Sequence, residues 1–341
     1  MKSYNRLFCP LPRLLAAGLF LLGLVSCGGG NQNDEPNPVV LLADETLKPI
    51  MSAQLEAFKS GKERGMMGKK VDHDLPVEYL PGVRAYNRFM SKSDTDYVLV
   101  GTRSLREKEL NWWSDQRQWK PSTNSIAIDA VVPILHPDNA HQQMTRGELR
   151  GILRGDTHTW GALSGQADQD SIVVVFDRAN ASTRTTVEDS LLGGKPIAKE
   201  VAYDAGGPAK VIEYVAENPN AIGFIGYNWL SDGDDPTVQQ RRKRVKPLQF
   251  PHPAKEGQFI SLYSEYAHHY LRAGLYPLRR TVYFLNGVPR QSVGTRFESY
   301  IVSGKGQRVF WKAGLFPSQG ITRELEIKEE ELETIQPKSE Q

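Results

Sequence analysis

Cysteine is almost absent from this sequence of 341 residues. Its two cysteines, Cys9 and Cys27, both lie near the N-terminus, and none follows them. Disulfides, catalytic thiols and thiolate metal sites all need cysteines inside the folded body. The sequence therefore excludes a disulfide-stabilised scaffold, a cysteine enzyme and a cysteine-based metal site.

An excess of one charge and the common enzyme motifs are also lacking. The 42 Lys and Arg residues nearly balance 40 Asp and Glu residues, leaving a formal net charge of +2. So small an excess of positive charge does not produce an electrostatic field strong enough to argue for nucleic-acid binding. Neither a G-x-S-x-G nucleophile elbow nor His, Asp and Glu at metal-ligand spacing occurs. We therefore expect no enzyme activity, no metal and no other cofactor.

A run long enough to span a membrane is missing as well. Residues 14–25 are apolar, but a bilayer-spanning helix needs about 20 such residues. Three basic residues, Lys2, Arg6 and Arg13, precede or open the run. This arrangement predicts an export signal peptide over residues 1–26.

The predicted signal peptide ends in Leu24-Val25-Ser26-Cys27, which resembles the bacterial lipobox. The resemblance implies lipid attachment at Cys27, so we expect a protein anchored by lipid on the periplasmic or extracellular face of a bacterial membrane. The alternative is an ordinary cleavable signal in which Cys27 has no role. Residues 27–37 predict a flexible tether, because they are rich in Gly, Asn and Pro.

Strand and helix patterns alternate along the rest of the chain, which favours parallel βαβ units. Residues 39–43 and 171–176 are apolar runs typical of buried strands, and residues 125–135 can form a strand that crosses between two lobes. Apolar spacing predicts helices over residues 259–273 and 297–313. We expect an α/β protein with a first lobe of residues 38–124 and 233–325, a second lobe of residues 125–232, and a charged tail of residues 326–341.

Hydroxyl and guanidinium groups follow three of the predicted strands. The carboxyl ends of parallel strands bind ligands in open α/β sheets, and helix starts offer free N–H groups to anions. Together, the three turns predict an oxyanion site built from both lobes. The alternative for each turn is plain helix capping beside solvated arginines. The donors are Thr46 in the first turn, Thr102 and Arg103 in the second, and Arg178, Ser182, Thr183 and Arg184 in the third.

Five longer segments have distinctive patterns: residues 126–132, 137–139, 145–160, 218–227 and 297–314. These segments resemble the phosphate-binding component of the phosphate ABC importer, the PstS family. The resemblance implies a two-lobe periplasmic-binding-protein-like fold of type II, in which helices flank a mostly parallel sheet in each lobe and a hinge joins the lobes. It also implies phosphate or a related oxyanion as ligand, with ABC permease and ATPase subunits as partners.

The family's binding residues can be carried over position by position. Thr46 and Leu47 match its first-turn pair, and Arg178 and Ser182 match the arginine and serine of its long loop. A second alignment, shifted by one residue, places Thr183 and Arg184 in that loop instead. Both alignments stay open.

The turn that contains Thr102 and Arg103 departs from the family pattern. The best-studied members have an aspartate there that accepts a proton from the ligand, whereas this chain has Thr102 and Arg103. A donor in place of an acceptor predicts weaker discrimination against sulfate, unless Asp44, Glu45 or Asp204 supplies the acceptor.

The sequence therefore predicts a lipid-anchored solute-binding protein that captures phosphate or a similar oxyanion for an ABC importer. Two alternatives from other classes remain. One is a secreted phosphate-ester hydrolase, and the other is a sensory or scaffold lipoprotein that uses the same fold without transport.

Overall fold

The structure, a computed structural model, describes residues 37–61, 73–165, 170–288 and 291–320. The predicted signal peptide, Cys27, nearly all of the tether and the charged tail lie outside these ranges. Within them, no helix has the length and apolar character needed to cross a membrane.

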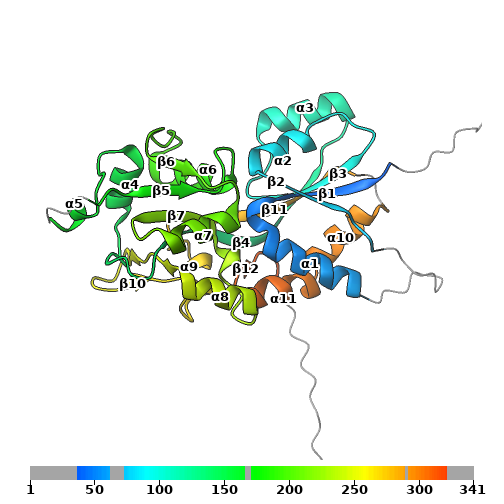
Figure 1. The fold of residues 1–341 in the computed structure, drawn as a ribbon. Helices are drawn as coiled ribbons and strands as arrows, with labels where there is room; N and C mark the ends of the chain where they lie inside the picture. Colours follow the sequence, from blue (N-terminus) through cyan, green and yellow to red (C-terminus); the bar gives the residue numbers. More distant parts are fainter. Residues whose placement is uncertain (1–36, 62–72, 166–169, 289–290, 321–341) are drawn as a thin grey trace, which may run out of the picture. The chain divides into compact units, whose positions relative to one another are not determined.

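Ten strands form one mixed sheet (Figure 1). The main path is β2-β1-β3-β11-β4-β7-β5-β6, and β8 and β12 also pair with β4. Pairing is parallel around β1 and β5, whereas β11 and β4 run antiparallel to their neighbours. The strands are β1 (Val39–Asp44), β2 (Val77–Leu80), β3 (Asp96–Gly101), β4 (Ser122–Leu135), β5 (Val173–Phe176), β6 (Ala202–Asp204), β7 (Ala221–Gly226), β8 (Lys246–Pro247), β11 (Arg279–Asn286) and β12 (Phe316–Pro317).

Helices cover both faces of the sheet half that contains β1. Leu41 and Ala43 face one core cluster, and Leu42 faces another, as the alternation of side chains along a strand requires. The first cluster packs against α1, α10 and α11, and the second against α2 and α3 (Figure 1). These helices are α1 (Lys48–Ser60), α2 (Gly82–Phe89), α3 (Glu107–Arg117), α10 (Val293–Val302) and α11 (Gly304–Lys312).

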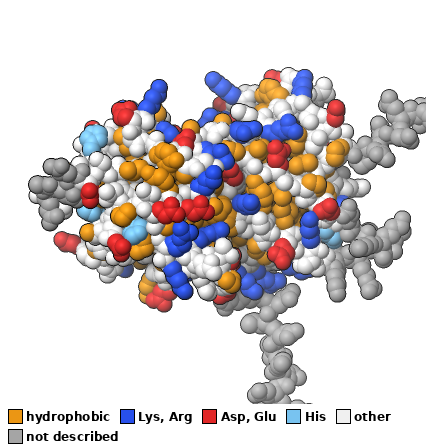
Figure 2. Space-filling view, in the orientation of Figure 1, with side chains coloured by type: hydrophobic (Ala, Val, Ile, Leu, Met, Phe, Trp, Pro, Cys, Tyr) orange, Lys and Arg blue, Asp and Glu red, His pale blue; other side chains and the backbone are white. Residues whose placement is uncertain are grey.

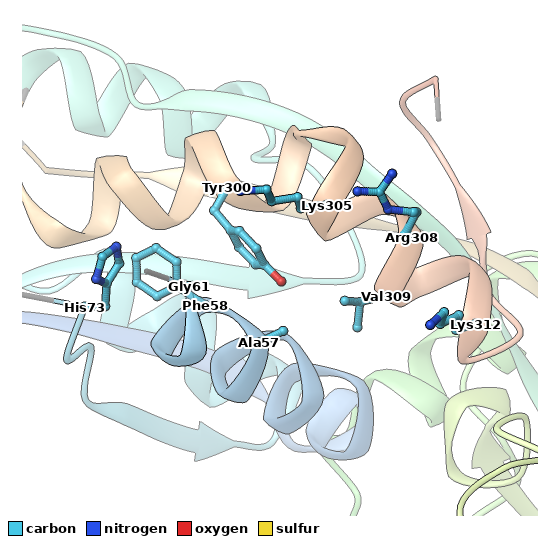
Figure 3. A pocket seen from close by; sticks show the side chains of 9 residues that line it. All are labelled: Ala57, Phe58, Gly61, His73, Tyr300, Lys305, Arg308, Val309 and Lys312. Atoms are coloured by element: carbon cyan, nitrogen blue, oxygen red, sulfur yellow. The ribbon is translucent and has the colours of Figure 1, made fainter. Parts of the chain in front are cut away.

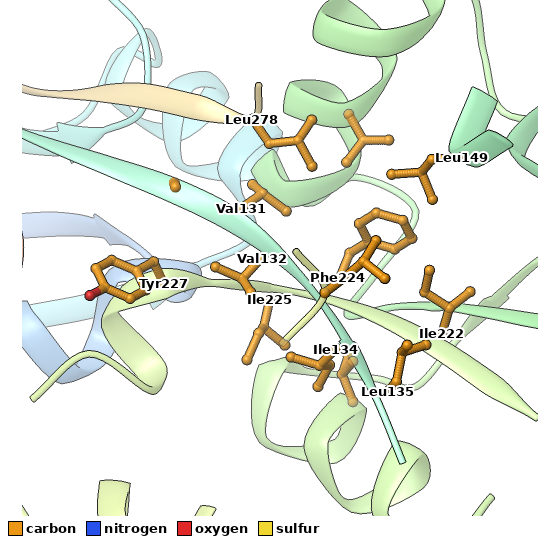
Figure 4. Packing of buried hydrophobic residues seen from close by; sticks show 14 of the residues in the cluster. Val131, Val132, Ile134, Leu135, Leu149, Ile222, Phe224, Ile225, Tyr227 and Leu278 are labelled. Atoms are coloured by element: carbon orange, nitrogen blue, oxygen red, sulfur yellow. The ribbon is translucent and has the colours of Figure 1, made fainter. Parts of the chain in front are cut away.

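The other sheet half has a single core cluster. β7 is buried along its whole length, and Phe224 and Ile225 pack beside Val131 and Val132 of β4 (Figure 4). The apolar strands predict this burial, because strands covered on both faces lack polar alternation. The helices are α4 (Arg146–Arg154), α5 (Gly161–Ser164), α6 (Ser182–Leu192), α7 (Pro208–Glu217), α8 (Pro236–Arg244) and α9 (Ala267–Arg272).

The long strand β4 joins the two halves, as the sequence predicts. Its first part pairs with β11, and the part from Val131 to Leu135 pairs with β7. The predicted α/β fold of two lobes flanked by helices is therefore confirmed, with parallel pairing around β1 and β5 within a sheet that is mixed as a whole.

The return to the first lobe differs from the expected position at residue 233. Val245, Phe250 and Leu271 belong to the core of the second lobe, and β8 pairs with the second-lobe end of β4. By packing, the chain therefore re-enters the first lobe at β11. The short antiparallel pair β9 (Phe250–Pro251) and β10 (Phe259–Ile260) lies in this returning segment.

Two predicted helices are shorter than expected. Of residues 259–273, only α9 is helical. Residues 297–313 fall in two helices rather than one, because Ser303 is extended, with φ −71° and ψ 163°, between α10 and α11.

Candidate functional site

Two hydroxyl groups from opposite lobes meet at the ends of β1 and β5. After β1, the Asp44 side chain accepts the Thr46 N–H at 3.0 Å and caps a short 3-10 helix, η1 (Glu45–Leu47). After β5, the turn leads into α6, whose first residue is Ser182. Thr46 Oγ1 lies 3.0 Å from Ser182 Oγ, and both residues are buried. The structure therefore brings these two predicted residues together.

A buried guanidinium that sequence reasoning missed lies against this hydroxyl pair. Arg280 of β11 donates to Ser182 Oγ at 3.0 Å and to Thr46 Oγ1 at 3.1 Å. It also forms an ion pair with Asp129 of β4 at 2.8 Å. A signal for both residues exists, because a lone charge inside an apolar strand such as residues 126–132 needs a buried partner.

The predicted Arg178 also joins the two lobes. Its Nε donates to Glu45 Oε1 at 2.9 Å, and its side chain is 44% exposed. Burial raises the pKa of Glu45, and the nearby Arg178 guanidinium partly offsets that rise. A backbone bond from Val83 N–H to the Asn180 carbonyl, 3.2 Å long, lies at the same junction. Arg178 is thus in place beside the Thr46 turn.

Thr183 and Arg184 have partners within the second lobe. The Thr183 hydroxyl donates to Asp177 Oδ1, and Arg184 Nε donates to Glu188 at 3.2 Å. Burial raises the pKa of Asp177 to about 7, although the Thr183 bond opposes the rise. Leu47 packs its side chain into the core, which leaves only its backbone for a ligand.

Thr102 and Arg103 line a cavity between the lobes. Its volume is about 210 Å³. Lys, Arg, Asp and Glu side chains are interspersed across the face of the molecule shown in Figure 2. The cavity is lined by Gly82, Val83, Tyr86, Asn87, Thr102, Arg103, Arg106, Glu109, Ser182, Thr185, Thr186 and Asp189.

Arg103 is already paired in this cavity. Its Nη1 and Nη2 each lie 2.7 Å from a carboxylate oxygen of Glu109, and its guanidinium stacks 3.8 Å from the centre of the Tyr86 ring. Burial alone would raise the pKa of Glu109, but the bonds from Arg103 and the Arg106 amide lower it overall. Gly101 permits the Tyr86 contact, because a Cβ there would lie 2.4 Å from the Tyr86 hydroxyl. The Arg103 charge is therefore largely satisfied by Glu109.

A second cavity, of about 260 Å³, lies between α1 and the helices α10 and α11 (Figure 3). Lys305, Arg308 and Lys312 of α11 and Tyr300 of α10 line it opposite Phe58. It is remote from the strand ends, and its cations come from one outer helix. The convergent hydroxyls and helix starts that suit a small oxyanion are at the junction of the lobes instead.

The described residues include no candidate metal site. No cluster of three or more His, Cys, Asp or Glu side chains there could hold a metal ion. The carboxylates at the lobe junction are each bonded to a neighbouring donor: Asp44 to the Thr46 amide, Asp129 to Arg280 and Asp177 to Thr183.

Known proteins resemble this chain in sequence and in fold. The phosphate-binding protein PstS of Pseudomonas aeruginosa is 26% identical over 247 residues, which cover 67% of this chain and 70% of that protein. PstS of Bacillus subtilis is 25% identical over 232 residues, covering 64% and 71%. The predicted resemblance to the PstS family is therefore confirmed.

Solved structures agree in fold. A protein from Clostridium perfringens, solved with bound phosphate, matches with a TM-score of 0.60 and 20% identity over 82% of this chain and 100% of that one. An ABC-type phosphate transport receptor from Vibrio cholerae matches with a TM-score of 0.55 and 19% identity over 81% and 99%. The model of the PBP superfamily domain matches residues 30–305. The chain therefore belongs to the PBP superfamily.

Proposed function

We propose that this protein is an extracytoplasmic solute-binding protein that captures phosphate for an ABC importer. The observation that carries the proposal is the pair of buried hydroxyls, Thr46 and Ser182, that meet 3.0 Å apart from opposite lobes at strand ends. A small anion that bonds to both hydroxyls would favour the closed arrangement of the lobes. Relatives named for phosphate binding support phosphate as that anion.

Arg178 and Arg280 would supply positive charge near the ligand. A phosphate oxygen accepts hydrogen bonds well from guanidinium and hydroxyl groups and from helix N-termini. Thr102 and Arg103 would contribute from the cavity wall. Thr183 and Arg184, which are bonded to Asp177 and Glu188, would support the loop that carries Ser182.

Selection against sulfate would come from a carboxylate. Asp44 is buried, and its Oδ2 has no hydrogen-bond partner within the described part of the chain. A Cβ added at Gly82 would lie 3.1 Å from Asp44 Oδ2 and 2.9 Å from the Ser182 Cβ, which places this oxygen beside the hydroxyl site. A protonated phosphate can donate to such an oxygen, whereas sulfate at neutral pH has no proton to donate. We therefore revise the expectation of weak discrimination, which depended on a free Arg103.

Export and lipid attachment at Cys27 complete the proposal. The basic start, the short apolar run and the lipobox-like sequence support them. Transport across the membrane would then be carried out by a separate ABC permease and ATPase.

Calorimetric titration of the protein without its signal peptide tests the ligand. We expect saturable binding of phosphate that a large excess of sulfate does not abolish. Hydrolysis of p-nitrophenyl phosphate, assayed in parallel, separates binding from catalysis. Phosphate binding without turnover supports the proposal, whereas ester hydrolysis at a steady rate would favour the hydrolase alternative.

A further inference from the structure

Arg280 occupies the centre of the lobe junction. The residue is 5% exposed. Its Nε and Nη2 donate to Asp129 Oδ2 at 3.1 and 2.8 Å, while Nη1 and Nη2 donate to Ser182 Oγ and Thr46 Oγ1 at 3.0 and 3.1 Å. One guanidinium edge is thus fixed by a carboxylate, and another edge reaches one hydroxyl from each lobe.

The surroundings of Arg280 are shaped to hold it in this position. Gly226 ends β7 beside it, and a Cβ at Gly226 would lie 2.8 Å from Arg280 Nη2. Asn228 donates to the Thr46 carbonyl at 2.8 Å and lies 3.4 Å from Asp129 Oδ2. The guanidinium therefore lies in a fitted, buried setting that includes the backbone of the Thr46 turn.

These contacts decide which way the two hydroxyls can donate. Arg280 has only donors, so Thr46 Oγ1 and Ser182 Oγ must both accept from it. Each hydroxyl keeps one hydrogen. Only one of these two hydrogens can serve the bond between the hydroxyls, since one oxygen must be its acceptor. The other hydrogen is left for a third group that accepts a hydrogen bond, and an oxyanion oxygen is such a group.

The other arginines near the junction are paired differently. Arg178, Arg103 and Arg184 donate to the carboxylates of Glu45, Glu109 and Glu188. Of the described arginines with hydrogen bonds at the junction, Arg280 alone contacts the hydroxyls of both Thr46 and Ser182.

We infer that Arg280 is a positioning residue for oxyanion binding. It donates to the oxygens of Thr46 and Ser182, so that a hydroxyl hydrogen is left for the ligand, and it brings a buried positive charge to the same place. Asp129 fixes the guanidinium in its orientation. This inference rests on the proposed function, because it assigns to Arg280 the donor character of the same site.

Substitution of Arg280 by lysine tests the inference, since lysine keeps the charge but cannot reach Asp129 and both hydroxyls as a planar fork. We expect Arg280→Lys to weaken phosphate binding about tenfold or more in calorimetry. Arg279→Lys, at the neighbouring position of β11, is the matched control and should leave affinity within about twofold of the wild type.

A double-mutant cycle with Ser182→Ala separates positioning from mere structural support. If Arg280 acts through the hydroxyls, Arg280→Lys should cost much less affinity in the Ser182→Ala protein than in the wild type. If Arg280→Lys lowers phosphate affinity by the same factor in both backgrounds, to within about twofold, then Arg280 does not act through Ser182.

A second variant is needed because Arg280→Lys can leave the buried charge of Asp129 unpaired and so prevent folding. In this variant both residues of the ion pair are replaced by uncharged ones. Asp129→Asn combined with Arg280→Gln keeps hydrogen-bonding groups without buried charge, and we expect this protein to fold and to bind phosphate about tenfold or more weakly. Wild-type affinity in this variant or in Arg280→Lys would overturn the inference. Absence of phosphate binding by the wild type would instead overturn the proposed function.

Discussion

At the scale of single residues, the site depends on which predicted donors remain available once the chain has folded. Thr46 and Ser182 are adjacent, whereas Arg103 is bonded to Glu109 and Thr183 to Asp177. Sequence reasoning located the turns, because strand ends with hydroxyls precede helices. It did not predict these side-chain pairings, which depend on contacts between segments far apart in the chain.

Substitution of Arg178 and substitution of Arg103 should lower the affinity for phosphate by different amounts. Arg178→Ala removes a guanidinium beside the Thr46 turn, and we expect a loss of about 1.5–3 kcal/mol in phosphate binding, the usual contribution of a charge-assisted bond. Arg178 makes one bond to Glu45, whereas Arg103 is held by two 2.7 Å bonds to Glu109, so Arg103→Gln should cost clearly less. Calorimetry of both variants checks this order. An unchanged affinity in Arg178→Ala would remove Arg178 from the site.

Asp177 makes stability depend on pH in a defined direction. Its pKa is raised from 3.8 to about 7 by burial, so the folded protein binds this proton more tightly than the unfolded chain. Its contribution to the free energy of unfolding is therefore fully present below about pH 4 and is lost as the pH rises through about 7.

Asp177→Asn should remove this dependence. Relative to the wild type, we expect the free energy of unfolding of the variant to rise by up to about 1.4 kcal/mol per pH unit between about pH 4 and 7. Urea denaturation without phosphate at several pH values measures the difference. A constant difference across this range would show that Asp177 keeps an ordinary pKa in the folded protein.

At the scale of elements, local sequence patterns predicted strands and helices best where the patterns are strongest. The buried strands β1 and β5 follow from their apolar runs, and Thr145 and Glu148 form a capping box at the start of α4, with bonds in both directions. The segment between α8 and β11 was assigned to the wrong core, because its short apolar stretches do not reveal which sheet half they cover. The break at Ser303 was missed for a similar reason, since apolar spacing continues across it.

Thr145→Ala tests the capping box separately from ligand binding. The Thr145 hydroxyl accepts the Glu148 N–H at 3.1 Å, and loss of such a cap costs about 1 kcal/mol. We expect that decrease in the free energy of unfolding, with phosphate affinity unchanged. Thr145→Ser, which keeps the hydroxyl, is the control. A decrease of equal size in both variants would show that the hydroxyl cap is not the cause.

At the scale of the whole molecule, the proposal joins a lipid anchor to a folded binding body. The anchor depends on Cys27, which lies outside the described residues. Mass spectrometry of the wild type should find lipid on Cys27, and Cys27→Ala should release the protein from the membrane fraction. Cys9→Ala, inside the predicted signal peptide, should leave it attached. Wild-type levels of Cys27→Ala protein in the membrane would contradict lipid anchoring at this residue.

The central claim is that phosphate binds where the two lobes meet, beside Thr46 and Ser182. A crystal structure of the phosphate-bound protein tests it most directly. The account predicts a phosphate with oxygens within hydrogen-bond distance of both Thr46 Oγ1 and Ser182 Oγ, close to Arg178 and Arg280. Phosphate bound only elsewhere, such as in the cavity beside Lys305 and Arg308, would contradict it.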